Sequence, residues 1–204
     1  MRKTKEEAAA TRKALMEAAL SVFSRQGYAA TRLEDIAREA GVTRGAIYWH
    51  FGSKAELYNA LMSETADRIE DVVKGAVAGG GGFIATTRRV MVRLLEFLEE
   101  DETYRAVQEL MLLKTEFSPE LMEGIQVKLG ANRMLIERLI QLFRAGIEYG
   151  EVRADLDPRL GALGMLTYLN GVVSSWLFDP QSFSISKDAP GLVDIFIQGI
   201  IART

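Results

Sequence analysis

Residues 33–51 read LEDIAREAGVTRGAIYWHF and predict two short helices joined by a tight turn. The turn falls at residues 40–43, where Gly41 permits the positive φ that such a turn needs. Val42 is expected to fill the angle between the two helices. Five apolar residues are expected to close the small core, namely Ile36, Ala37, Val42, Ile47 and Phe51. This spacing is typical of a helix-turn-helix.

The second of these helices leaves polar and aromatic residues facing away from that core. Thr43 is its expected N-cap, and Arg44 and Tyr48 are i, i+4 neighbours on one exposed face. A recognition helix places its N-terminal residues against base edges in the major groove. Arg44 can donate two hydrogen bonds to guanine, and Gly45 would let the backbone approach DNA closely. The segment therefore predicts a DNA-reading surface.

Residues on either side extend the predicted surface. Lys54 would face a phosphate beside the positive end of the next helix, and residues 2–5 could form a minor-groove arm. The predicted DNA-binding residues are Arg2, Lys3, Lys5, Thr31, Arg32, Thr43, Arg44, Gly45, Tyr48, Trp49, His50 and Lys54. Each basic residue alone could be ordinary solvated charge, and the aromatic residues could be core. Their coincidence on one helix-turn-helix favours DNA binding.

Helical patterns continue on both sides of this segment. One apolar face precedes it at the spacing of a buried helix, formed by Leu15, Ala18, Ala19, Val22 and Phe23. Gly27 is expected to end that helix as a left-handed cap that packs Phe23 against Tyr28. Residues 31–34 (Thr-Arg-Leu-Glu) and 53–56 (Ser-Lys-Ala-Glu) match capping boxes and predict the starts of two further helices.

The helix that starts near residue 53 is expected to reach about residue 78. Four consecutive glycines at 79–82 then mark the clearest break in the chain, because such a run cannot hold a helix in water. Asp157-Pro158 is a start signal, with an N-cap before a proline at the first helical position. Later helices are expected at about 84–100, 103–116, 119–149, 158–178 and 190–203.

Glycines 124, 130 and 146 lie inside the expected 119–149 helix and predict a kink or close packing there. No alternating strand pattern is found. The predicted fold class is therefore all-α. It comprises an N-terminal three-helix helix-turn-helix DNA-binding domain (1–55) and a C-terminal helical bundle (56–204) for ligand binding and dimerisation. The helix at about 53–78 links the two domains.

Composition limits the classes of function. Hydrophobic residues make up 48% and charged residues 26%, as in soluble globular proteins. The absence of cysteine and the single histidine leave almost nothing for a zinc site or a catalytic triad. No Glu-x-x-His pair and no phosphate-binding loop are present. We therefore expect no enzyme, no metal and no cofactor.

Charge is distributed unevenly. Residues 1–55 hold ten basic and six acidic side chains, whereas the remainder holds 15 basic and 22 acidic ones. A basic N-terminal region followed by an acidic remainder is typical of a nucleic-acid-binding protein with a second domain. The uncharged stretch 160–178 approaches membrane-spanning length, but its three glycines favour a packed helix. The N-terminus lacks the apolar core of a signal peptide, so a cytoplasmic protein without membrane contact is expected.

Residues 12–61 closely resemble the DNA-binding domain of the TetR family. Segment 41–51 (GVTRGAIYWHF) is similar to the AcrR-type branch, whose members are local repressors of multidrug efflux pumps. Fainter similarity continues at residues 114–117 and 171–183. The resemblance implies a palindromic double-stranded operator and a homodimer formed through the last two helices. It also implies a hydrophobic inducer whose binding pivots the fourth helix and separates the recognition helices from successive major grooves.

The same resemblance places pocket walls in the C-terminal bundle, at Val90, Met91, Leu94, Gln108, Leu112, Leu135, Leu139, Leu166 and Asn170. Seven of these nine side chains are apolar, which favours uncharged or weakly polar aromatic compounds. Relatives can carry an acid at the position of Asn170 and a histidine at that of Leu112. These departures argue against a preference for cationic drugs.

The sequence thus predicts a ligand-responsive transcriptional repressor of a multidrug efflux operon. Two alternatives stay open at this point. TetR-type regulators of lipid or aromatic metabolism have the same architecture, and a DNA-binding regulator can lack a small-molecule inducer altogether.

Overall fold

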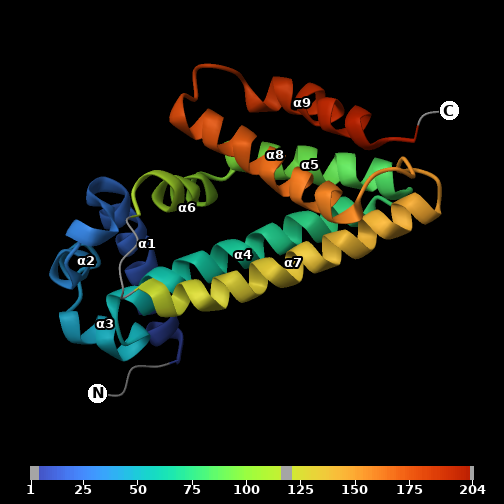
Figure 1. Ribbon diagram of the computed structural model, residues 1–204. Helices are drawn as coiled ribbons and strands as arrows, with labels where there is room; N and C mark the ends of the chain where they lie inside the picture. Colours follow the sequence, from blue (N-terminus) through green and yellow to red (C-terminus); the bar gives the residue numbers. More distant parts are fainter. Residues whose placement is uncertain (1–4, 116–120, 203–204) are drawn as a thin grey trace. The chain divides into compact units, whose positions relative to one another are not determined.

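The computed structural model describes residues 5–115 and 121–202, and its helices there are shown in Figure 1. They are α1 (Lys5–Ala30), α2 (Leu33–Glu39), α3 (Arg44–Phe51), α4 (Lys54–Ala78), α5 (Phe83–Glu100), α6 (Glu102–Leu113), α7 (Met122–Glu148), α8 (Pro158–Phe178) and α9 (Ile185–Ile200). Within these ranges the β-type pairing is a single antiparallel bridge between Val152 and Ile201. The predicted all-α fold is confirmed.

The chain divides into two compact units. The first unit comprises residues 1–67 and 103–127, and the second comprises residues 68–102 and 128–204. Helices α4 and α7 each contribute residues to both units. The domain boundary expected after residue 55 stays a prediction.

Aromatic side chains join α1 to α4 in the core of the first unit. The ring centroids of Phe23 and Tyr28 are 5.6 Å apart, and that of Tyr58 lies 5.9 Å from Phe23 and 5.2 Å from Tyr28. Gly27 makes this possible because it leaves the helical conformation at φ 78° and turns the chain back. The predicted contact between Phe23 and Tyr28 is confirmed.

The start of α2 differs from its prediction. No side chain caps this helix, and Arg32 occupies the N-cap position, so the capping box at residues 31–34 is wrong. The Thr31 hydroxyl instead donates a hydrogen bond to the carbonyl oxygen of Gly27 at 2.7 Å. This local turn takes the hydroxyl away from α2. At α4 the Ser53 hydroxyl does accept the N–H of Glu56 at 3.1 Å, as the second capping box requires.

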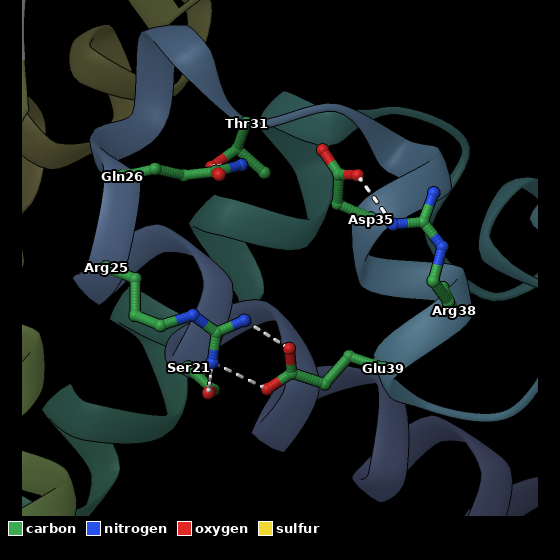
Figure 2. Close-up of polar contacts among 7 residues, drawn as sticks. All are labelled: Ser21, Arg25, Gln26, Thr31, Asp35, Arg38 and Glu39. Carbon is green, nitrogen blue, oxygen red and sulfur yellow. Dashed lines mark hydrogen bonds and ion pairs between the residues drawn. The ribbon is translucent and has the colours of Figure 1, made fainter.

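An ion pair joins the ends of α1 and α2 (Figure 2). The Arg25 guanidinium donates to both carboxylate oxygens of Glu39, with Nη1 3.0 Å from Oε1. Arg25 Nη1 also donates to the Ser21 hydroxyl at 2.7 Å. These contacts lower the pKa of Glu39 to about 2, chiefly through the hydrogen bond from Arg25. The pair therefore orients the helix-turn-helix against α1.

Helices α5, α8 and α9 pack together in the second unit. The Arg88 side chain on α5 binds Asp194 on α9 through two hydrogen bonds, of 2.6 and 3.0 Å. The run of four glycines separates α4 from α5 as predicted. The Glu151 carboxylate accepts the first N–H groups of α5, from Phe83 and Ile84, at 2.9 and 3.0 Å. It thereby supplies the N-terminal cap that the glycines cannot provide.

The two last helices test the predicted boundaries. Helix α8 begins at Pro158 as expected, and the Asp157 side chain accepts the N–H of Arg159 at 2.8 Å. Helix α9, expected from residue 190, begins at Ile185 instead because the Ser184 hydroxyl caps it through the N–H of Lys187. Pro190 consequently lies inside the helix. The predicted start was five residues too late.

Within the described ranges, α8 is also the one helix long and apolar enough to cross a membrane by length and composition. A single helix of this kind is weak support for a membrane segment. Only 28% of its most apolar window is buried inside the chain, so the expectation of a packed helix is met only in part. Leu160 and Phe178 of α8 are 58% and 83% exposed in the single chain.

Candidate nucleic-acid interface

A tight turn joins α2 to α3 at the predicted position. Gly41 has φ 67°, a left-handed conformation that favours glycine. Its N–H donates to the carbonyl oxygen of Arg38 at 3.2 Å, and the N–H of Val42 donates to that of Ala37 at 3.0 Å. The two short helices are thus held at an angle by backbone hydrogen bonds as well as by packing.

The core of this helix-turn-helix matches the expected set. Ile36 and Ile47 are fully buried, and Ala37 and Phe51 are nearly so. Val42 is half-buried and packs against them. Because these five core residues turn inward, the side chains of α3 that are not among them lie on the opposite face.

That opposite face carries the predicted reading residues. Thr43, Arg44 and Gly45 are exposed at the start of α3. Tyr48 is 45% exposed and Trp49 is 72% exposed, which is unusual for aromatic side chains. The His50 ring is half-buried, and its centroid lies 4.4 Å from that of Trp49. The fold therefore brings these six predicted residues to one short helix and its N-cap.

Packing inside the chain does not require a glycine at position 45. A Cβ built there would have its nearest neighbour, the Thr43 hydroxyl oxygen, at 3.7 Å, which is an ordinary contact. Its φ is not positive either. Glycine in a helix is less favourable than alanine by about 1 kcal/mol. A glycine here would instead be explained by the close approach of another molecule to the backbone of α3.

Arg44 is held by two neighbours. Its Nη1 donates to Oε1 of Glu34 at 2.5 Å, and its Nη2 donates to the Tyr48 hydroxyl at 2.5 Å. The guanidinium carbon also lies 5.2 Å from the centre of the Tyr48 ring. The Tyr48 hydrogen bond, followed by the charge of Glu34, raises the pKa of Arg44, so the guanidinium stays charged. Sequence reasoning missed Glu34, because nothing in the spacing shows which acid lies near Arg44.

The other predicted DNA-binding residues lie in different surroundings. Arg32 and Lys5 are exposed, whereas Arg2 and Lys3 lie outside the described residues. Thr31 is buried. The Lys54 ammonium donates to the carbonyl oxygens of Tyr28 and Thr31, each at 3.0 Å, so it has partners within the first unit. Whether any of these residues contacts DNA stays a prediction.

The nine predicted pocket residues are distributed over both units. Gln108 and Leu112 lie on α6 in the first unit, and the other seven lie on α5, α7 and α8 in the second. Val90 and Met91 are buried, whereas Leu112, Leu135 and Asn170 are exposed within the single chain. Gln108 hydrogen-bonds Tyr104, whose pKa burial raises to about 12. The ligand pocket stays a prediction.

Comparison with known proteins shows the family. Residues 15–61 match the family model of the bacterial regulatory proteins of the tetR family. Residues 84–201 match the C-terminal region of the MAATS-type transcriptional repressors. The HTH-type transcriptional regulator AcrR of Shigella flexneri is 34% identical over 198 residues, which cover 97% of this chain and 92% of that protein.

Solved structures agree with these matches. The crystal structure of NalD, the secondary repressor of a multidrug efflux pump in Pseudomonas aeruginosa, has a TM-score of 0.87 and 29% identity, and 97% and 98% of the two chains are covered. A complex of SmeT with triclosan has a TM-score of 0.79 and 26% identity, with 94% and 92% covered. The chain therefore belongs to the TetR family of DNA-binding bacterial transcriptional regulators, with a C-terminal region of the MAATS-type repressors.

Proposed function

We propose that this protein represses a multidrug efflux operon and is released from its operator by a hydrophobic small molecule. The observation that carries the proposal is the exposed face of α3, where Arg44, Tyr48 and Trp49 project from a fully formed helix-turn-helix core. The relatives support an efflux operon as the regulated target, since NalD represses a multidrug efflux pump. A repressor of this kind acts on chromosomal DNA, which places it in the cytoplasm.

The proposed operator is a palindrome read by a homodimer that forms through α8 and α9. Large apolar side chains on these helices support this interface, because Phe178 is 83% exposed and Ile195 is 66% exposed. Between α8 and α9 lies an open groove of about 860 Å³ lined in part by Thr167, Gly171 and Leu192. Its lining is mostly apolar or neutral, with Asp188 as a charged residue, and an exposed apolar surface of this kind marks an interaction site. A second copy of the chain would cover it by two-fold symmetry.

The proposed inducer is uncharged or weakly polar, and aromatic. SmeT, which represses the multidrug efflux pump SmeDEF of Stenotrophomonas maltophilia, has been crystallised with triclosan, which supports a hydrophobic ligand for a close structural relative. The predicted pocket residues are mostly apolar, with Gln108 and Asn170 as neutral hydrogen-bonding groups. An inducer must bind the DNA-incompetent state more tightly, since otherwise it shifts no equilibrium.

Selection of genomic fragments by the purified protein at physiological salt tests this proposal. We expect enrichment of a palindrome next to a transporter operon, and release of that fragment by at least one hydrophobic compound. Arg44→Ala is the matched variant, because it removes the base-reading group and leaves the core intact. It should abolish enrichment while helicity and dimerisation are retained. Binding that is weak, strongly salt-dependent and indifferent to sequence would refute the proposal.

A further inference from the structure

Glu34 and Arg44 form an ion pair across the helix-turn-helix, on the face that carries the reading residues. Glu34 lies in the first turn of α2 and Arg44 is the first residue of α3. Their closest atoms, Oε1 and Nη1, are 2.5 Å apart. The side chain expected to read a base thus carries a carboxylate partner before any DNA is bound.

Stability does not explain this pair. The side chain of Arg44 is 54% exposed and that of Glu34 is 49% exposed. Exposed ion pairs contribute little to folding, because water screens the charges and ordering two long side chains costs entropy. A carboxylate close to a DNA-binding face also repels phosphate. We therefore look for the role of Glu34 in the recognition of DNA.

Hydrogen-bond geometry indicates such a role. A guanidinium has five N–H donors, of which Glu34 and Tyr48 together take two. Three donors remain, which is enough for the two hydrogen bonds that guanine accepts at O6 and N7. The guanidinium is therefore oriented by two partners in advance and retains the donors that guanine needs. A free arginine, by contrast, binds any phosphate within reach.

We propose that Glu34 is a positioning residue for DNA specificity, which orients Arg44 toward guanine and suppresses its binding to phosphate. The inference rests on the proposed function, since it assigns Arg44 to base reading. It adds to that function the group that determines whether the Arg44 guanidinium binds guanine or phosphate. Glu34 itself touches no base in this scheme and acts through Arg44.

The variant Glu34→Gln removes the charge and preserves the shape of the side chain. Asp35→Asn is the matched control, because Asp35 lies on the same turn and pairs with a different arginine, Arg38, at 3.4 Å. Affinity is measured by fluorescence anisotropy on the selected operator, on the operator with its contacted guanine replaced, and on a random duplex. We expect Glu34→Gln to reduce guanine discrimination at least fivefold, and Asp35→Asn to leave it unchanged. Equal discrimination in both variants would overturn the proposal.

A second measurement does not depend on finding an operator. On a random duplex, Glu34→Gln should steepen the dependence of log affinity on log salt by about one, the effect of one added phosphate contact. In an Arg44→Ala background, Glu34→Gln should leave the slope of log affinity against log salt unchanged. A steepening that persists without Arg44 would show a bulk charge effect and overturn the proposal. Failure to select any operator would refute the repressor function and leave this comparison intact.

Discussion

The backbone N–H of Tyr28 donates a hydrogen bond to the backbone carbonyl oxygen of Lys114 across 3.4 Å. Two further contacts strengthen this junction in the first unit. The Lys114 ammonium donates to the carbonyl oxygen of Ser24 at 2.9 Å, and the Thr115 hydroxyl lies 3.1 Å from that of Tyr58. The segment that follows α6 is therefore attached to the end of α1 and to the start of α4.

Lys114→Met is expected to weaken this junction. It removes the charged hydrogen bond to Ser24 and the ion pair with Glu109, and it keeps an unbranched side chain and the backbone contact with Tyr28. We expect the free energy of unfolding to fall by about 1–2 kcal/mol. Urea unfolding followed by circular dichroism measures it. Lys74→Met, which removes an exposed ion pair with Glu70 on the same helix, should leave the midpoint unchanged. The junction would be unimportant if both variants unfolded alike.

The ion pair of Arg25 and Glu39 should make stability depend on acid pH. Because the folded protein holds the pKa of Glu39 at about 2, below the ordinary value of 4.5, the unfolded chain binds a proton first as pH falls. Because the pair is largely exposed, its stabilisation is small; it is present above pH 4.5 and is lost progressively as pH falls from there toward 2. Glu39→Gln should therefore be less stable than wild type at pH 7, and the gap should narrow below pH 4.5. Measuring unfolding at pH 7, 5, 4 and 3 would show this. A gap constant over that range would contradict it.

Two glycines of α7 should respond oppositely to alanine. At Gly146 an added Cβ would lie 2.8 Å from Cγ2 of Val152 and 2.9 Å from Cγ of Phe83, so Gly146→Ala should destabilise by about 1–3 kcal/mol. At Gly130 none of the described atoms lies within 4 Å of such a Cβ. Gly130→Ala should stabilise by about 1 kcal/mol through helix propensity. Thermal unfolding of both variants decides the matter, and a loss of stability at both positions would refute the packing argument.

Charge introduced on α9 should break the proposed dimer. Ile195→Glu places a carboxylate at a side chain that is 66% exposed in the single chain and would be buried between two copies. Light scattering after gel filtration should show a monomer, and operator affinity should fall because two half-sites are no longer read together. Tyr149→Glu alters a side chain that is 81% exposed outside α8 and α9, and it should remain a dimer. A dimeric Ile195→Glu variant would place the interface elsewhere.

Local sequence determined much of this fold. The turn at Gly41, the break at residues 79–82 and the start of α8 at Pro158 all follow from backbone preferences of a few adjacent residues. The buried faces of α2 and α3 follow from the spacing of Ile36 and Ile47. Such features need no knowledge of distant contacts, because they depend on φ, capping and helical periodicity alone.

Tertiary structure decided which groups meet. The hydroxyl of Thr31 bonds Gly27, and the ammonium of Lys54 bonds the end of α1; both residues were predicted to contact DNA. Glu34 reaches Arg44, ten residues away, because of the angle at which α2 meets α3. That angle is held by the backbone hydrogen bonds of the turn and by the packing of the small core. The i, i+4 spacing predicted that Arg44 and Tyr48 are neighbours. The contact between Arg44 and Glu34 depends on how two separate helices meet in space, and it was not predictable from the sequence.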